Sequence, residues 1–247
     1  MSSVFKLLLW SLLGTASALA QSPDKKGVGL VESAGLGEIQ LQNLQVAWYY
    51  NWGPKSAVQS RAEFVPMVFS ARSIKADIEG PVVLGFNEPD NAKQSNIPVL
   101  QALGLWPPVL GKAHRVGAPA MAGNPVRGDW LPAFMQARPR VDFMTLHWYK
   151  GVDAAKFIRD VQAVCGAYNK PAWVTEYAPQ TAAQAKDQPD KYSQTQVNRF
   201  IRETVAWMNA SPCVERFAWH DAKRGTSALF DQQGALTATG LAYALAK

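Results

Sequence analysis

Short apolar runs recur along the chain between longer segments, and this pattern restricts the possible folds most strongly. Most of the runs are continuously apolar, which is typical of strands buried on both faces, as in parallel sheets. We interpret eight runs as strands: Val28–Leu30, Val46–Tyr50, Phe64–Phe69, Val82–Phe86, Arg115–Ala118, Phe143–His147, Ala172–Thr175 and Arg216–Trp219.

Between the later runs, apolar residues recur at the spacing of one helix face. Residues 157–168 and 197–208 show this spacing, and residues 99–113 show it with an expected break or kink at Pro107-Pro108. Strands that alternate with helices predict an α/β fold, a (β/α)8 TIM barrel, in one domain over residues 21–247. The rival is a doubly wound open sheet, which usually carries a Gly-rich phosphate fingerprint that this sequence lacks.

The N-terminus is typical of a secretory signal peptide over residues 1–20. Lys6 is basic, Leu7–Leu13 is an apolar run broken only by Ser11, and Ala18-Leu19-Ala20 is a small-residue cleavage pattern. The apolar run is shorter than the roughly 20 residues that cross a bilayer. We therefore expect a secreted or periplasmic protein that keeps no membrane segment after cleavage.

The two cysteines fit an exported protein with one disulfide. Cys165 falls at the end of a predicted helix and Cys213 just before a predicted strand. If these elements feed neighbouring strands, both thiols lie at the same end of the fold. We expect a Cys165–Cys213 disulfide with a structural role, although pairing geometry cannot be read from sequence.

Charge argues against a nucleic-acid partner. The chain carries a net charge of +6, and its basic residues are scattered, with no run longer than Lys25-Lys26. A mildly basic, solvated surface accounts for this pattern. No apolar surface stripe suggests an interface, so we expect a monomer.

Polar and aromatic side chains directly follow five of the predicted strands. These segments are Asn51-Trp52, Asn87-Glu88-Pro89-Asp90, His147-Trp148-Tyr149, Glu176-Tyr177 and Trp219-His220-Asp221. In a TIM barrel all of these positions gather at the C-terminal face, where active sites lie. Two carboxylates and several aromatic rings would then meet in one cleft.

This combination suits cleavage of a glycosidic bond. One protonated carboxyl group gives a proton to the leaving oxygen, and one carboxylate attacks the anomeric carbon or activates water. The apolar faces of sugar rings lie on Trp and Tyr, and their hydroxyl groups need polar partners. A phosphorylated substrate would require Arg and Lys instead, and few lie near these strand ends.

Several motifs resemble glycoside hydrolase family 128. They are VAWYYNWGP at 46–54, FVPM at 64–67, GFNEPD at 85–90, VDFMTLHWY at 141–149 and WVTEYA at 173–178. The Asn-Glu-Pro triplet alone is shared by many barrel glycosidases, whereas the ordered set is much more specific. The resemblance covers about residues 26–244 and implies a (β/α)8 barrel and retaining cleavage of β-1,3-glucan.

The resemblance also implies roles for individual residues. Glu88 matches the acid/base and Glu176 the nucleophile, and Asn87 would bind the sugar 2-hydroxyl. Tyr149 or His147 would hold and tune Glu176. Together with their strand-end neighbours they form the expected substrate-binding set: Asn51, Trp52, Asn87, His147, Trp148, Tyr149, Tyr177 and Trp219, with Trp52, Trp148 and Trp219 as sugar platforms. His220, after the eighth strand, departs from the expected apolar or aromatic residue, which leaves the nearby rim subsites open.

A retaining mechanism predicts a carboxylate separation of about 5–5.5 Å, against roughly 6.5–9.5 Å for inversion. It also predicts a raised pKa on Glu88 while Glu176 stays ionised. We expect Asp90 to be a turn or cap residue, Asp142 to lie at the bottom of the barrel and Asp221 to serve the loop.

Other chemistries receive little support. The histidines lack the spacing of a zinc motif, so we expect no metal and no cofactor, and no G-x-S-x-G serine motif occurs. Two alternatives stay open. One is a non-catalytic glucan-binding protein on the same barrel, and the other is a relative that cleaves β-1,4-linked polysaccharide.

Overall fold

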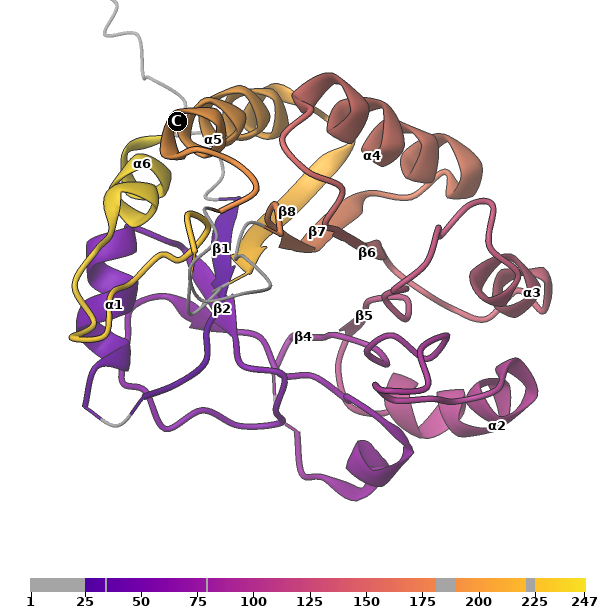
Figure 1. The fold of residues 1–247 in the computed structure, drawn as a ribbon. Coiled ribbons are helices and arrows are strands. Elements are labelled where there is room, and N and C mark those ends of the chain that lie inside the picture. The colour runs from indigo at the N-terminus through magenta and orange to yellow at the C-terminus, as the bar shows by residue number, and fades with distance from the viewer. Residues whose placement is uncertain (1–24, 34, 79, 181–189, 221–224) are drawn as a thin grey trace, which may run out of the picture.

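The computed structural model describes residues 25–33, 35–78, 80–180, 190–220 and 225–247. The predicted signal peptide and Asp221 lie outside these ranges. Within them, a central ring of strands is surrounded by helices (Figure 1). None of the described helices is long and apolar enough to cross a membrane.

The strands form a closed parallel barrel. Their bounds are β1 (Lys26–Gly29), β2 (Trp48–Tyr50), β3 (Glu63–Phe64), β4 (Val82–Val83), β5 (Arg115–Val116), β6 (Met144–Trp148), β7 (Ala172–Tyr177) and β8 (Val214–His220). Six pair in the order β3-β2-β1-β8-β7-β6, and β4 pairs with β5. Parallel bridges Met67–Leu84 and Gly117–Phe143 join these two groups on both sides. The TIM barrel predicted from the sequence is thereby confirmed.

The helices cover the outside of the barrel. They are α1 (Gly37–Leu44), the 3-10 helix η1 (Ala71–Lys75), α2 (Val99–Leu110), α3 (Trp130–Gln136), α4 (Ala154–Tyr168), α5 (Gln194–Ala210) and α6 (Ala238–Leu245). Ser193 begins α5 with a capping box that includes Gln196. Pro107 and Pro108 lie inside α2, which continues to Leu110, so the expected break does not occur before them. Between β2 and β3 the chain forms a loop instead of a helix.

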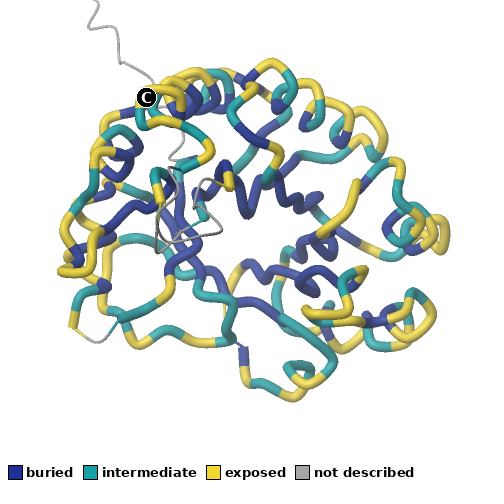
Figure 2. The backbone as a smooth tube through the Cα atoms, viewed as in Figure 1, coloured by how far each residue is buried: buried dark blue, intermediate teal, exposed yellow. Residues whose placement is uncertain are grey.

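Two cores result from the alternation of side chains along each strand. The inner core fills the barrel and comprises Trp48, Tyr50, Val65, Met67, Val82, Leu84, Phe143, Trp173 and Ala218. The larger outer core lies between the strands and the helices. Buried residues accordingly form the central part of Figure 2, with exposed residues around the rim. Gly27 leaves room inside for a bulky neighbour, since a Cβ there would lie 2.3 Å from the Trp48 ring.

A disulfide joins Cys165, near the end of α4, to Cys213, just before β8. These positions lie at the N-terminal ends of the strands, away from the predicted active site. The bond closes a loop between residues 48 apart. Its role is therefore structural.

Removing this disulfide should lower stability without changing the fold. Chain entropy for a loop of this length corresponds to about 4 kcal/mol of stabilisation. We expect the Cys165→Ala/Cys213→Ala double variant to unfold at a lower temperature than the oxidised protein, measured by circular dichroism. The reduced wild type should match the double variant. Equal midpoints for the oxidised and reduced wild type would contradict a stabilising disulfide.

Candidate active site

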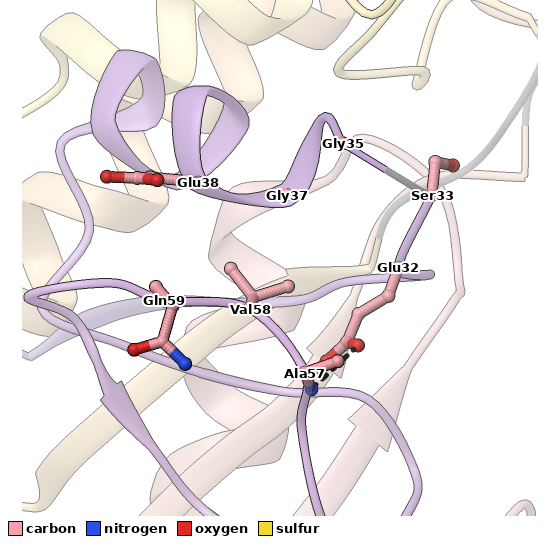
Figure 3. A pocket seen from close by; sticks show the side chains of 8 residues that line it. All are labelled: Glu32, Ser33, Gly35, Gly37, Glu38, Ala57, Val58 and Gln59. Atoms are coloured by element: carbon pink, nitrogen blue, oxygen red, sulfur yellow. Dashed lines mark hydrogen bonds between the residues drawn. The ribbon is translucent and has the colours of Figure 1, made fainter.

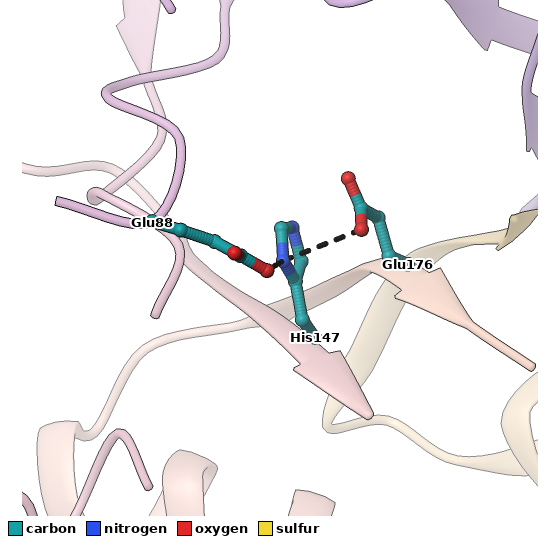
Figure 4. Close-up of side chains that lie close together, drawn as sticks. All are labelled: Glu88, His147 and Glu176. Carbon is teal, nitrogen blue, oxygen red and sulfur yellow. Dashed lines mark hydrogen bonds and ion pairs between the residues drawn. The ribbon is translucent and has the colours of Figure 1, made fainter. Parts of the chain in front are cut away.

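Glu88, His147 and Glu176 meet beyond or at the carboxyl ends of β4, β6 and β7 (Figure 4). The Nδ1 atom of His147 lies 2.8 Å from Glu88 Oε1 and 3.4 Å from Glu176 Oε2. One carboxylate oxygen from each glutamate and this nitrogen all lie within 4.8 Å of one another. The two carboxylates are therefore close together and are bridged by one imidazole ring.

Glu176 is surrounded by hydrogen-bond donors. Its Oε1 accepts from Trp52 Nε1 at 2.7 Å and from the Tyr50 hydroxyl at 3.2 Å. Its Oε2 accepts from the Tyr149 hydroxyl at 2.5 Å. Hydrogen bonds to a charged group are the stronger class. They hold the Glu176 carboxylate, only 5% exposed, in one orientation.

A β-bulge aims Glu176 into the barrel. Leu146 pairs with Val174 and His147 with Glu176, so β7 contains one extra residue, Thr175, over this interval. Trp173 points into the inner core. Strict alternation from Trp173 would turn Glu176 outward, and the extra residue restores the inward direction. The inward position of the Glu176 carboxylate thus depends on a local irregularity of the strand.

Glu88 occupies a left-handed backbone conformation, with φ of 43°. Its N–H donates to the Ala120 carbonyl at 2.7 Å, and its Oε2 accepts from Asn91 Nδ2 at 3.0 Å. Left-handed backbone in a residue other than glycine often marks a functional site. The outlier supports a functional role for this carboxylate.

The pKa of Glu88 is lowered, contrary to the expectation from the sequence. Burial alone raises the pKa, but the hydrogen bond and charge of His147 and the hydrogen bond of Asn91 outweigh it. For His147, burial lowers the pKa, but the charges of Glu176 and Glu88 and the Glu88 hydrogen bond raise it above its usual value. In the free site the proton of the Glu88–His147 pair therefore favours His147.

Three aromatic rings surround the two carboxylates. The His220 ring lies edge-on to Trp52 at 5.5 Å and to Tyr149 at 5.6 Å between centroids. Burial lowers the pKa of His220, and the charge of His147 adds to this, although Glu176 and Glu88 oppose it. A largely neutral imidazole between two aromatic rings offers both an apolar edge and a hydrogen-bonding group.

The two asparagines of the expected site have different surroundings. Asn87 is 3% exposed, and its Oδ1 has no hydrogen-bond partner among the described residues. Asn51 instead makes contacts within the protein, to Glu32 at 2.7 Å, the Lys55 carbonyl at 3.0 Å and the Gly53 N–H at 2.9 Å. Asn87 thus has a free acceptor, whereas Asn51 holds a loop together.

The expectation that Trp148, Tyr177 and Trp219 bind sugar was wrong. All three side chains are at most 1% exposed. Trp148 stacks on Phe200 of α5, with centroids 5.6 Å apart. Trp219 packs on Tyr177 at 4.9 Å and donates from Nε1 to the Ser227 carbonyl. Each precedes or follows an inward-facing residue on its strand, so it faces the outer core and leaves no surface for a substrate.

Tyr50 is the site residue that sequence reasoning missed. It lies on β2, is fully buried and donates to both Glu176 and the Thr175 carbonyl. Its two-residue spacing from Trp52 was the available signal, because residues two apart on a strand share a face. Burial and the neighbouring Glu176 raise its pKa well above its usual value, so the hydroxyl keeps its proton.

A pocket of about 430 Å³ lies between the β1–α1 and β2–β3 loops (Figure 3). Its lining includes Glu32, Glu38 and Val58. Neither Glu88 nor Glu176 lines it. The pocket is therefore separate from the carboxylate cluster. It borders the loop that carries Trp52.

Comparison with known proteins places the barrel in a family. Residues 27–243 match the family model described as the glycosyl hydrolase catalytic core. A solved variant of a family 128, subgroup I endo-β-1,3-glucanase from Amycolatopsis mediterranei, in complex with laminaripentaose, has the same fold. Its TM-score is 0.81 at 33% identity, covering 91% of this chain and 100% of that chain. The chain belongs to glycoside hydrolase family 128.

Two further proteins are similar to the chain. Alkali-sensitive linkage protein 1 of Schizosaccharomyces pombe is 28% identical over 239 residues, 89% of this chain but 44% of that protein. The chain therefore spans less than half the length of that relative. An oligosaccharide-binding protein of subgroup VII from Trichoderma gamsii shares the fold at 24% identity and a TM-score of 0.73, covering 89% of this chain and 92% of that chain. Family membership alone therefore does not establish hydrolysis.

The coupling between Glu88 and His147 predicts a measurable change in titration. Glu88→Gln should lower the pKa of His147, because it removes one of the carboxylates that raise it. NMR titration of the histidine ring signals measures this shift, and the chain contains only three histidines. An unchanged pKa of His147 in the variant would contradict the coupling.

The same pKa shifts set the pH range in which the pair stabilises the fold. The contribution of Glu88 is present above the usual glutamate pKa and is lost as pH falls through its lowered value. That of His147 is present below 6.5, its usual value, and is lost as pH rises through its raised value. Relative to Glu88→Gln, the wild type should therefore gain most stability between these limits.

Proposed function

We propose that this protein is a retaining glycoside hydrolase that cleaves β-1,3-glucan internally, with Glu88 as acid/base and Glu176 as nucleophile. The observation that carries the proposal is the pair of buried carboxylates with oxygens within 4.8 Å of each other. This upper limit on the distance between one oxygen of each group is short of the roughly 6.5 Å at which inversion begins, and it favours retention, for which about 5–5.5 Å is typical.

The substrate class follows from the family and from the lining of the site. The Amycolatopsis mediterranei relative was solved with laminaripentaose, a β-1,3-linked oligosaccharide. In this chain, Trp52, Tyr149 and His220 present aromatic edges beside the carboxylates. We propose that the free Oδ1 of Asn87 accepts a hydrogen bond from the sugar 2-hydroxyl.

The surroundings of the two glutamates assign their roles. Glu176 receives three hydrogen bonds from Trp52, Tyr50 and Tyr149, which hold its carboxylate in a fixed orientation for attack on the anomeric carbon. Glu88 instead shares its proton with His147 across 2.8 Å. A carboxyl group linked to a titratable partner suits proton transfer in both directions.

In the first step, Glu176 attacks the anomeric carbon and Glu88 protonates the leaving oxygen, giving a glycosyl ester on Glu176. As the charge of Glu176 passes into the new bond, His147 loses an anion that raises its pKa. The proton shared by His147 and Glu88 then becomes easier to release to the leaving group. In the second step, ionised Glu88 takes a proton from a water molecule. The water oxygen attacks the anomeric carbon, and Glu176 leaves as a carboxylate.

The proposal extends to where and how the protein acts. Residues 1–20 carry the pattern of a secretory signal, so we propose action outside the cytoplasm. We also propose that the protein acts as a monomer. Its mildly basic surface has scattered charges, which gives no support to a nucleic-acid partner.

Product analysis tests the proposed reaction. The wild type should release short β-1,3-oligosaccharides from laminarin or curdlan and leave cellulose, mannan and xylan intact. Proton NMR should show the β-anomer first, as retention requires. Glu88→Gln should lower kcat/KM by about 10²–10⁴-fold, and Glu176→Gln should abolish detectable cleavage. Glu38→Gln, at an exposed position on α1, is the matched control.

Each contradictory result has a distinct meaning. Cleavage of a β-1,4-linked substrate alone would overturn the proposed linkage. First release of the α-anomer would overturn retention. Oligosaccharide binding by calorimetry without cleavage of any glucan would identify a binding protein on this barrel.

Metal independence is a separate prediction. Glu88, His147 and Glu176 have the composition of a possible cation site. The 2.8 Å contact between Glu88 and His147 is, however, the length of a direct hydrogen bond. We expect dialysis against EDTA to leave laminarin hydrolysis unchanged. Loss of activity on chelation, with recovery on adding a divalent cation, would contradict this account.

A further inference from the structure

Trp52 bonds to the proposed nucleophile from an unfavourable backbone conformation. Its φ is 62°, in the left-handed region, which is strained for a residue other than glycine. Its indole N–H donates to Glu176 Oε1 at 2.7 Å. The loop between β2 and β3 must therefore be held in place to keep this donor on the nucleophile.

Glu32, on the loop after β1, makes the contacts that hold it. Its Oε1 accepts from Asn51 Nδ2 at 2.7 Å and from Ser56 Oγ at 2.5 Å. Its Oε2 accepts from the Ala57 N–H at 3.4 Å. Figure 3 shows the Glu32 carboxylate turned toward the backbone at Ala57. One half-buried carboxylate thus binds both sides of the loop that contains Trp52.

Asn51 connects Glu32 to the backbone around Trp52. While its Nδ2 donates to Glu32, its Oδ1 accepts from the Gly53 N–H at 2.9 Å. The asparagine side chain therefore spans the peptide units on either side of Trp52. The Gly53 carbonyl in turn accepts from the Met67 N–H at 3.0 Å, which ties the loop to the barrel.

We propose that Glu32 is a positioning residue that keeps the Trp52 N–H on Glu176 by fixing Asn51. This inference rests on the proposed function, because Glu176 is the nucleophile only in that account. Hydrogen bonds to a charged group are the stronger class. Without Glu32, the loop loses the acceptor of two side-chain donors, and the anion of Glu176 loses an oriented donor.

Kinetics of Glu32→Ala test the proposal with a double-mutant cycle. The variant should lower kcat about 10–100-fold with little change in KM, and the acidic limb of its pH–rate profile should move to higher pH. Trp52→Phe should do the same. In the Trp52→Phe background, Glu32→Ala should lower kcat by less than about 3-fold, because both changes act through one hydrogen bond. Additive losses would overturn the proposal.

Two controls separate positioning from folding. Glu32→Gln keeps an acceptor oxygen for Asn51, so it should retain most of the activity. Glu38→Ala removes an exposed carboxylate that lines the same pocket and makes none of the Glu32 contacts, so it should leave kcat unchanged. Activity that followed thermal stability across all variants would indicate a merely structural role and overturn the proposal.

A spectroscopic readout does not depend on hydrolysis. In ¹⁵N-tryptophan NMR of the full-length protein, the signal missing from Trp52→Phe identifies the Trp52 indole. Glu32→Ala and Glu176→Gln should both shift this signal and speed its hydrogen exchange, whereas Glu38→Ala should not. An unmoved signal in Glu32→Ala would overturn the positioning role. An inactive wild type with the expected shifts would instead overturn only the proposed hydrolysis.

Discussion

The active site depends on one imidazole placed between two buried carboxylates. Glu88 and Glu176 are 9% and 5% exposed, and burying two neighbouring anions is costly without compensation. His147 provides that compensation with a raised pKa and with Nδ1 within 3.4 Å of both groups. The ends of β4, β6 and β7 must therefore meet in a fixed register, which only the closed barrel secures.

Different irregular features of the barrel direct the two carboxylates toward each other. The bulge at Thr175 turns Glu176 inward, and the left-handed backbone of Glu88 turns the carboxylate proposed as the acid/base toward it. Tyr50, from the opposite part of the barrel, reaches the Thr175 carbonyl and Glu176 at the same time. The irregular segments are thus held by the inner core, and the strained positions coincide with the proposed chemistry.

The architecture was predictable because continuous apolar runs and helical spacing are local signals. The strand ends also located Glu88, His147 and Glu176, since parallel strands deliver their C-terminal residues to one face. The direction of each side chain was harder to predict. Trp148, Tyr177 and Trp219 are next to inward-facing residues, and a difference of one residue along a strand sends a side chain to the opposite core.

Other features depend on contacts that no local pattern reveals. The pKa of Glu88 is lowered because His147 and Asn91 reach it, and the sequence does not show those distances. The role of Glu32 depends on two loops that meet only after the barrel closes. Contacts between residues far apart in the sequence thus became known only from the structure.

Trapping of the glycosyl-enzyme tests the central claim most directly. A 2-deoxy-2-fluoro β-laminaribiosyl fluoride should glycosylate the nucleophilic carboxylate of a retaining enzyme, with loss of fluoride, and the resulting glycosyl ester should hydrolyse slowly. The account predicts a single added fluorosugar unit, which peptide mass spectrometry locates on Glu176, and no adduct in Glu176→Gln. An adduct on another residue, or turnover of laminarin with inversion and no adduct, would contradict it.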